Sequence, residues 1–436
     1  MKLLTCLLLP AATITFAALE DHITEYDLPN GLHVIIYADS SAPVVSTNVF
    51  YKVGAYDELP GHTGLSHMLE HMTFKHSNRY TPGTFHRMVD SAGGYNNGFT
   101  STYYTGYYED LASDRWEFAL ELEAARMSSC RFDSAEFASE HQVVTEEWRL
   151  GENRPASRFW KEFEAVCYSV HPQRQPIIGY GDDISNFTAQ KAEAWYRRHY
   201  NPANAVLVIA GDVRVDQARK LVGRHFEGLK GTPVERADYY NLEPEQRSER
   251  RLVVRDEVQE PAVRIGWHNA GIRDPDAFAG DVAAGILAHG RSSRLYRLLV
   301  TENRLATQVS GANYFSRDPG LFSLYIRPVS EEAIPEIERI VDQEVARLRT
   351  ELVAGRELEK VRNQVLADQI FDKDDISDLA YYLAMYHITQ GTWRGFERYA
   401  ERVRAVARED VKQFCVDYLK HDNKTTGLLL PRKDEG

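Results

Sequence analysis

An internal repeat is the feature of this 436-residue chain that most restricts its fold. The segment that starts at residue 43, PVVSTNVFYKVGAYDELPGHTGLSHMLEHM, is similar to the one that starts at residue 261, PAVRIGWHNAGIRDPDAFAGDVAAGILAHG. Each contains an apolar, β-branched strand pattern, a polar turn and an amphipathic helix pattern. HYNPANAVLVIAGD, from residue 199, likewise resembles LKHDNKTTGLLLPR, from residue 419. A repeat of about 220 residues predicts two related halves rather than three unrelated domains.

Strand and helix patterns are mixed within each half, which favours an α+β fold. We expect strands near residues 32–38 and 45–53 and helices near residues 64–74 and 116–127. Residues 231–250 are charged, contain two prolines and have little periodicity, so we interpret them as a linker. The predicted domains are therefore residues 19–230 and residues 251–436.

The first 18 residues, MKLLTCLLLPAATITFAA, have the pattern of a secretory signal peptide. Lys2 is followed by an apolar stretch and then by the small-x-small sequence Thr15-Phe16-Ala17, which is typical of a cleavage site. We expect export, most simply to a bacterial periplasm; a buried N-terminal helix is the alternative. The apolar stretch is too short to span a membrane, and no later stretch approaches ~20 apolar residues, so we expect no integral membrane segment.

The charge and cysteine content exclude several classes of protein. A net charge of −13 argues against a nucleic-acid partner, which needs a basic surface. Removal of the signal leaves Cys130, Cys167 and Cys415, an odd number at wide spacings with no C-x-x-C pair. This pattern favours small buried side chains over metal ligands, although the sequence leaves one disulfide open.

The sequence His67-Met68-Leu69-Glu70-His71 carries the chemistry of the chain. His67 and His71 are four residues apart in a helical pattern, so both imidazoles lie on one face and can reach one zinc ion. Glu70 projects near the same face. Zinc lowers the pKa of a bound water to about 7, and a carboxylate in this place can take its proton during attack on a carbonyl. The alternative is an ordinary helix that happens to carry two histidines.

A catalytic zinc ion usually has a third protein ligand and an open position. Glu140 and Glu147 lie downstream in EHQVVTEEW, seven residues apart and hence on one helix face. From the spacing alone, either one can bind the metal while the other orients a ligand.

With these motifs in place, the chain resembles the inverzincin metallopeptidases of the pitrilysin/insulinase family. The similarity is to the branch that includes mitochondrial processing peptidase and its bacterial relatives. Besides H-x-x-E-H, the matching segments are LPNGLHVII from residue 28, VGAYDE from residue 53, GGYNNGFT from residue 93, VVTEEWR from residue 143, NPANAVLVIAGDV from residue 201 and GRSSRLYRLLVTENRLA from residue 290. Together they extend over nearly the whole chain after the signal.

The resemblance implies a site and a fold. It implies one zinc ion per chain, bound by His67, His71 and Glu147, with Glu70 as the general base. Glu140 matches an acidic position that orients a ligand, and Glu146 is the less favoured neighbour of Glu147. The implied fold is two homologous domains, each a mostly antiparallel sheet packed with helices and related by internal pseudo-symmetry.

The resemblance also implies how substrate binds. In relatives the strand that matches Asn97, Gly98 and Phe99 is an exposed edge, to which an extended peptide adds as a further strand. These residues are therefore the expected substrate-binding backbone. The alternative is an ordinary hairpin rich in glycine and tyrosine.

Two departures from the family pattern bear on partners. The second half reads AGDVAAG at residues 279–285, where the first has its ligand helix, so we expect no second zinc site. Active single-component relatives carry an arginine and a tyrosine seven residues apart in the second domain, where this chain has Val300 and Thr307. None of the candidate substitutes has a matching position; these are Arg297, Arg304 and Tyr314.

We therefore expect a zinc-dependent endopeptidase that cleaves unfolded peptides in an enclosed chamber. The hypothesis is a heterodimer, in which this chain supplies zinc and a homologous subunit supplies the arginine and tyrosine; a homodimer is the other arrangement. The alternative function is a non-catalytic structural or partner subunit of the same family.

Overall fold

The computed structural model describes residues 19–236, 243–314 and 317–433, so the predicted signal at residues 1–18 lies outside the described residues. The described chain forms two sheets. The strands of the first are β1 (Ile23–Asp27), β2 (His33–Ala38), β3 (Val44–Tyr51), β4 (Tyr95–Thr100), β5 (Thr105–Ala112) and β6 (Ala205–Gly211). Those of the second are β7 (Arg250–Asp256), β8 (Ala262–His268), β9 (Ala306–Tyr314), β10 (Leu321–Pro328) and β11 (Lys424–Pro431).

The two sheets have the same topology, apart from the additional edge strand β1. The strand order is β1-β2-β6-β3-β5-β4 in the first and β7-β11-β8-β10-β9 in the second. In each sheet one pair is parallel, β2 with β6 and β7 with β11, and the other pairs are antiparallel. The predicted repeat and the mostly antiparallel α+β fold are therefore confirmed.

Helices separate and cover the strands. Those of the first half are α1 (Leu19–His22), α2 (Leu65–Thr73), α3 (Thr84–Ser91), α4 (Glu117–Ser129), α5 (Ser134–Glu152), α6 (Pro155–Cys167), α7 (Gly181–Ser185), α8 (Ala189–His199) and α9 (Val215–Phe226). Those of the second are α10 (Asp276–Ala288), α11 (Arg294–Tyr296), α12 (Ile334–Thr350), α13 (Gly355–Asp374), α14 (Ile376–Gln390), α15 (Arg394–Ala405) and α16 (Arg408–Tyr418).

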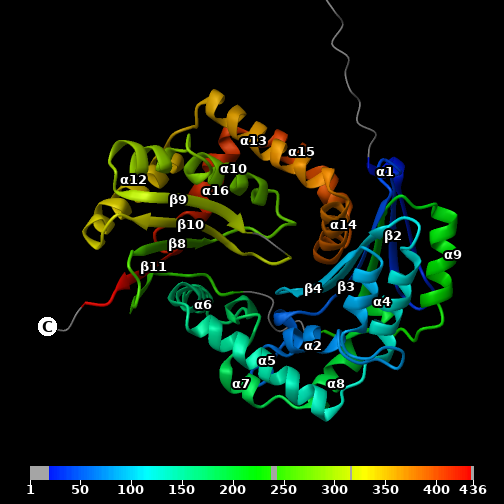
Figure 1. Cartoon of the computed structure of the whole chain (residues 1–436). Coiled ribbons are helices and arrows are strands. Elements are labelled where there is room, and N and C mark those ends of the chain that lie inside the picture. Colours follow the sequence, from blue (N-terminus) through cyan, green and yellow to red (C-terminus); the bar gives the residue numbers. More distant parts are fainter. Residues whose placement is uncertain (1–18, 237–242, 315–316, 434–436) are drawn as a thin grey trace, which may run out of the picture.

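Each half places one helix on the sheet of the other half (Figure 1). In the first sheet, Leu207 and Ile209 of β6 belong to the core of their own half, whereas Val206 and Val208 pack with α14 of the second half. In return, Phe159 and Phe163 of α6 reach the second sheet, where they contact Gly427. Both faces of the central strands are thus buried, which explains their nearly continuous apolar sequences.

Several sequence-based predictions can be compared with this fold. No helix or strand occurs among the described residues between α9 and β7, where the linker was expected, and the division into residues 19–230 and 251–436 stays a prediction. Cys130, Cys167 and Cys415 are all free thiols, so no disulfide joins any two of them. Among the described helices, none is both long and apolar enough to cross a bilayer.

Candidate metal centre

The helix that carries both histidines, α2, begins at a tight backbone crossing. Gly64, the residue before the helix, has φ +89°, and a Cβ there would overlap the backbone of Ile178. Gly179 has φ +92° and lies against Thr63 and Gly64 in the same way. The buried carboxylate of Glu58 accepts hydrogen bonds from the backbone N–H groups of Gly64 (2.7 Å) and Ser66 (2.6 Å). The side chain of Glu58 thereby caps the start of α2, where Gly64 has no side chain to do so.

The two histidines of α2 and one glutamate of α5 form a cluster with the geometry of a metal site. One ligand atom from each of His67, His71 and Glu147 lies within 4.8 Å of the other two. Glu147 Oε2 is 3.8 Å from His67 Nε2 and 3.5 Å from His71 Nε2. Within the described parts of the chain, this is the one group of three or more such residues that could hold a metal ion.

The donor set fits zinc. Zinc binds imidazole nitrogen and carboxylate oxygen at ~2.0–2.2 Å in a tetrahedral arrangement, which places neighbouring ligand atoms about 3.4 Å apart. The two measured separations from Glu147 Oε2 are close to that value. Two neutral imidazoles and one carboxylate also leave one tetrahedral position open, as in catalytic rather than structural sites.

The orientation of His71 is fixed by an acidic residue behind it. Glu140 Oε1 lies 2.9 Å from His71 Nδ1, and its other oxygen accepts from Lys75 Nζ at 2.7 Å. With Nδ1 bonded to Glu140, it is Nε2 of His71 that faces Glu147, and loss of its proton frees the lone pair that a metal requires. Burial lowers the pKa of His71, but the hydrogen bonds to Glu140 and Glu147 outweigh this and raise it to about 9. Metal binding at this site therefore displaces a proton.

His67 has the opposite electrostatic environment. Burial and the neighbouring charge of His71 lower the pKa of His67 to about 4, so its imidazole is neutral near pH 7. Its Nδ1 is buried and has no hydrogen-bond partner among the described residues. A neutral imidazole with Nε2 directed at Glu147 is ready to bind a cation.

Glu70 lies on the same helix and is held by the neighbouring strand. Thr100, at the end of β4, donates a hydrogen bond to Glu70 Oε2 at 2.7 Å. Burial raises the pKa of Glu70 above its ordinary value, against the opposing effect of this hydrogen bond. A carboxylate whose pKa is raised toward neutrality is better suited to take up and return a proton.

The strand beside Glu70 is an edge. β4 pairs only with β5, so one side of the strand has no partner strand within the described chain. Asn97 is exposed, and its Oδ1 accepts a hydrogen bond from the backbone N–H of Gly98 at 2.9 Å. The side chain of Phe99 instead packs between Phe50 and Tyr381 of α14. Asn97, Gly98 and Phe99 thus lie in the open edge strand that leads to Thr100 and Glu70.

The other residues considered from the sequence lie elsewhere. Glu146 pairs with Arg149 and is not part of the cluster formed by His67, His71 and Glu147. Val300 belongs to a π-helical turn (Arg297–Glu302), and Thr307 is exposed on β9. Arg304 has φ +53°, the one positive φ outside glycine among the described residues.

Sequence reasoning missed several residues of the site, because helix and strand patterns do not show which side chains contact one another. Thr100 contacts Glu70, Glu58 caps α2, and Gly179 makes room for Gly64. Lys75, which pairs with Glu140, is closer to the motif. Glycines at positions 64 and 179 were the one signal that could have revealed the crossing.

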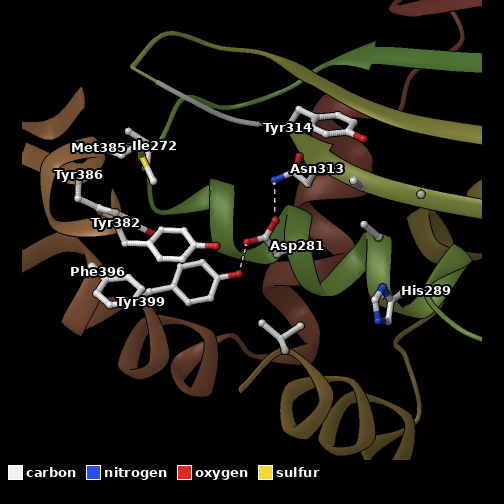
Figure 2. Close-up of a pocket in the computed structure, with 15 residues that line it drawn as sticks. Ile272, Asp281, His289, Asn313, Tyr314, Tyr382, Met385, Tyr386, Phe396 and Tyr399 are labelled. Atoms are coloured by element: carbon white, nitrogen blue, oxygen red, sulfur yellow. Dashed lines mark hydrogen bonds between the residues drawn. The ribbon is translucent and has the colours of Figure 1, made fainter. Parts of the chain in front are cut away.

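The equivalent helix of the second half, α10, is next to a pocket with different chemistry (Figure 2). Asp281 of α10 accepts hydrogen bonds from Tyr399 (2.6 Å) and Asn313 (3.4 Å). Aromatic side chains of α14 and α15, Tyr382 and Phe396 among them, form the opposite wall. Counted from the start of the repeat, Gly285 occupies the place of His67.

Comparisons with known proteins identify the family of the chain. A model of the insulinase family (peptidase family M16) matches residues 33–179, and a model described as the peptidase M16 inactive domain matches residues 186–365. Zinc protease PqqE of Helicobacter pylori is 31% identical over 410 residues, which make up 93% of this chain and 92% of that protein. The probable mitochondrial-processing peptidase subunit beta of Arabidopsis thaliana is 23% identical over 419 residues, 93% of this chain and 78% of that protein.

A solved structure shows that the fold is also similar to that of a known protease. The crystal structure of a protease from Helicobacter pylori superposes with a TM-score of 0.88 at 30% sequence identity, and the match covers 94% of this chain and 99% of that one. With the sequence resemblance thus confirmed over more than nine-tenths of its length, the chain belongs to the insulinase family, peptidase family M16.

Proposed function

We propose that the chain is a zinc-dependent endopeptidase that cleaves unfolded peptides. The observation that carries this proposal is the cluster of His67, His71 and Glu147, with ligand atoms within 4.8 Å of one another and Glu70 on the same helix. Relatives named zinc proteases support the same chemistry. Zinc, when bound, supplies a Lewis acid that polarises a peptide carbonyl and activates water for attack.

The residues of the site have separate roles in metal binding, orientation and proton transfer. His67, His71 and Glu147 hold the metal, and Glu140 keeps His71 in the tautomer that leaves Nε2 free. Glu70 takes up a proton and returns it to the departing amine, while Thr100 holds its carboxylate in place. Because Glu140 is itself neutralised by Lys75, it orients His71 without adding an unpaired charge.

We assign substrate binding to the open side of β4. A peptide that adds to this edge forms hydrogen bonds with alternate backbone groups of the segment Asn97, Gly98 and Phe99, and these bonds do not depend on the side chains of the peptide. The bond from the N–H of Gly98 to the side chain of Asn97 has to open for this, because a backbone N–H has one proton to donate.

The natural assembly is proposed to contain a second, homologous subunit. Val300 and Thr307 stand where active single-component relatives carry their arginine and tyrosine, so this chain lacks groups that would contact substrate from the second domain. A partner that carries both residues would complete the site and enclose the chamber. We place the assembly in a bacterial periplasm, on the basis of the signal-like residues 1–18.

The test combines metal content with activity. The purified chain should contain one zinc ion, hydrolyse unstructured peptides poorly alone, and hydrolyse them well with its partner. Glu70→Gln should keep the zinc and lose activity by at least about 100-fold, as expected for removal of a general base. A zinc-free chain, or activity unchanged by Glu70→Gln, would contradict the proposal and favour a non-catalytic subunit. Full activity of a homodimer would contradict only the proposed heterodimer and not the proposed peptidase activity.

A further inference from the structure

A large cavity lies between the two halves, next to the end of the edge strand β4. Its volume is about 580 Å³. Ser101 and Thr102, the residues that follow β4, form one side. Trp160 and Glu164 of α6 and Arg264 of β8 form another. The cavity therefore begins one residue beyond Thr100, which is bonded to Glu70.

Arg264 is the unusual member of this lining. Only 2% of its surface is exposed, yet it makes no hydrogen bond or ion pair with any residue that the structure describes. Its Nε and Nη1 are both buried without a partner. Buried guanidinium groups are almost always paired, because an uncompensated charge in the interior is strongly unfavourable.

Two aromatic side chains surround the guanidinium of Arg264. The aromatic rings of Trp160 and Phe163 lie close to its charged group as cation–π partners. The N–H groups point outward within the plane, where they match the two oxygens of a carboxylate.

Glu164 lines the same cavity but does not neutralise Arg264. The two side chains form no ion pair, although the charge of each shifts the pKa of the other. Burial raises the pKa of Glu164 to about 7, against the lowering effect of Arg264. Near neutral pH the Glu164 carboxyl is therefore protonated in a large fraction of molecules and can stand beside another carboxylate.

We propose that this cavity binds a carboxylate of the peptide substrate, with Arg264 as the residue that recognises it. The inference rests on the proposed function, because it takes β4 as the substrate edge. A paired strand advances ~3.3 Å per residue, so a peptide that leaves β4 at Thr100 reaches the cavity within a few residues. The carboxylate is that of an aspartate or glutamate side chain or that of the peptide's C-terminus.

Binding of short, unstructured peptides to the full-length Glu70→Gln chain tests this without hydrolysis. Fluorescein-labelled peptides carry one glutamate, or glutamine in its place, at successive positions, and each is made with a free or an amidated C-terminus. We expect at least one glutamate or free-acid peptide to bind about 10-fold tighter than its neutral counterpart, as a charge-assisted hydrogen bond provides. The glutamate and the C-terminal series separate the two sources of carboxylate.

Arg264→Met in the same background should abolish that difference. It should not lower the melting temperature, because it replaces an unpaired buried charge with an apolar side chain of similar length. Arg317→Met is the matched control: Arg317 also lies over aromatic rings, of Tyr56 and Tyr103, but is already paired with Asp318 at 3.0 Å. That variant should keep the preference for acidic peptides.

Three results would overturn the inference. They are equal affinity for acidic and neutral peptides, no binding of either, and a lower melting temperature for Arg264→Met with an unchanged preference for acidic peptides. The last result would make Arg264 a purely structural residue. If the wild-type chain with its partner hydrolyses peptides while any of these holds, the proposed function stands and only the carboxylate site fails.

Discussion

Helices α2 and α10 follow equivalent strands of the two sheets, but among the described residues only α2 supplies ligands to a possible metal site. On α2, Glu70 reaches toward β4, where Thr100 meets its carboxylate. On α10, glycine and alanine bring the helix directly against its neighbours. A Cβ at Gly280 would lie 2.6 Å from the side chain of Asn313, and one at Gly311 of β9 would lie 2.8 Å from Ala288. The same topology thus gives a partly exposed polar face on α2 and close contacts through small residues on α10.

The difference shows what each half contributes. The face of α2 that carries His67, Glu70 and His71 is only partly buried, so these side chains depend on outside partners for their orientation. Apart from Asp281, α10 is buried almost throughout, and its small residues belong to the core of the second half. A site needs partly exposed polar groups held by specific contacts, whereas a core needs close packing.

The largest expected effect tests the contacts that hold the open site. Glu140→Gln should weaken zinc binding by about 10–100-fold, because the amide no longer fixes His71 as a charged acceptor does. Competition with a zinc chelator measures the affinity. Glu136→Gln is the matched control, since Glu136 lies one turn earlier on α5 and pairs with His76 at 3.0 Å, outside the ligand cluster.

Equal loss of zinc in both variants would show that any glutamate of α5 matters only through its charge. Loss in neither would mean that the carboxylate of Glu140 does not control His71. The folded state itself should be little affected, because both substitutions replace oxygen by an amide of similar size.

The next effect tests the close packing of α10. Gly285→Ala should lower the free energy of unfolding by about 1–3 kcal/mol, since the new methyl group would overlap Val361, which is buried and β-branched. Gly223→Ala in α9 is the control, because the nearest atom to a Cβ there is Glu227 Oε2 at 3.6 Å. That variant should gain up to about 1 kcal/mol from helix propensity.

Urea denaturation of both variants measures the two changes. If Gly285→Ala were as stabilising as Gly223→Ala, α10 would not be closed against α13. The close packing that distinguishes α10 from α2 would then be absent.

Elements that are encoded by local sequence patterns were easier to predict than contacts between distant segments. The predicted helix near residues 64–74 and strand near residues 32–38 correspond to α2 and β2, because turn residues and periodicity are encoded locally. The cluster of His67, His71 and Glu147 was predicted in the same way, from helical spacing within α2 and within α5 together with the family resemblance.

The exchange of α6 and α14 between the sheets was not predictable from the sequence. Periodicity shows that a helix has an apolar face but not which sheet that face will cover. The orphaned guanidinium of Arg264 was hidden for the same reason, since its burial depends on Trp160, more than a hundred residues earlier. Long-range packing, rather than local propensity, positions these side chains.

The smallest expected effect concerns Asp281, the acidic residue in the middle of α10. Burial raises the pKa of Asp281 to about 7, although its side chain also accepts hydrogen bonds from Tyr399 and Asn313. The folded chain therefore keeps this proton up to about pH 7, whereas an unfolded aspartate loses it near pH 4. Since the folded state binds more protons over that interval, Asp281 makes stability fall as the pH rises from about 4 to 7.

Asp281→Asn should remove this dependence. The variant should match the parent near pH 4 and exceed it by about 1–2 kcal/mol near pH 8, less than the full pKa shift would give because Asp281 is partly exposed to its pocket. Urea denaturation at the two pH values measures the difference, in which the titration of the histidines on α2 cancels because they lie in the other half. A variant less stable than the parent at both pH values would mean that the charged carboxylate, with its bond from Tyr399, stabilises the second half. Asp281 would then resemble Glu140 of the first half, and the two helices would differ less than their packing indicates.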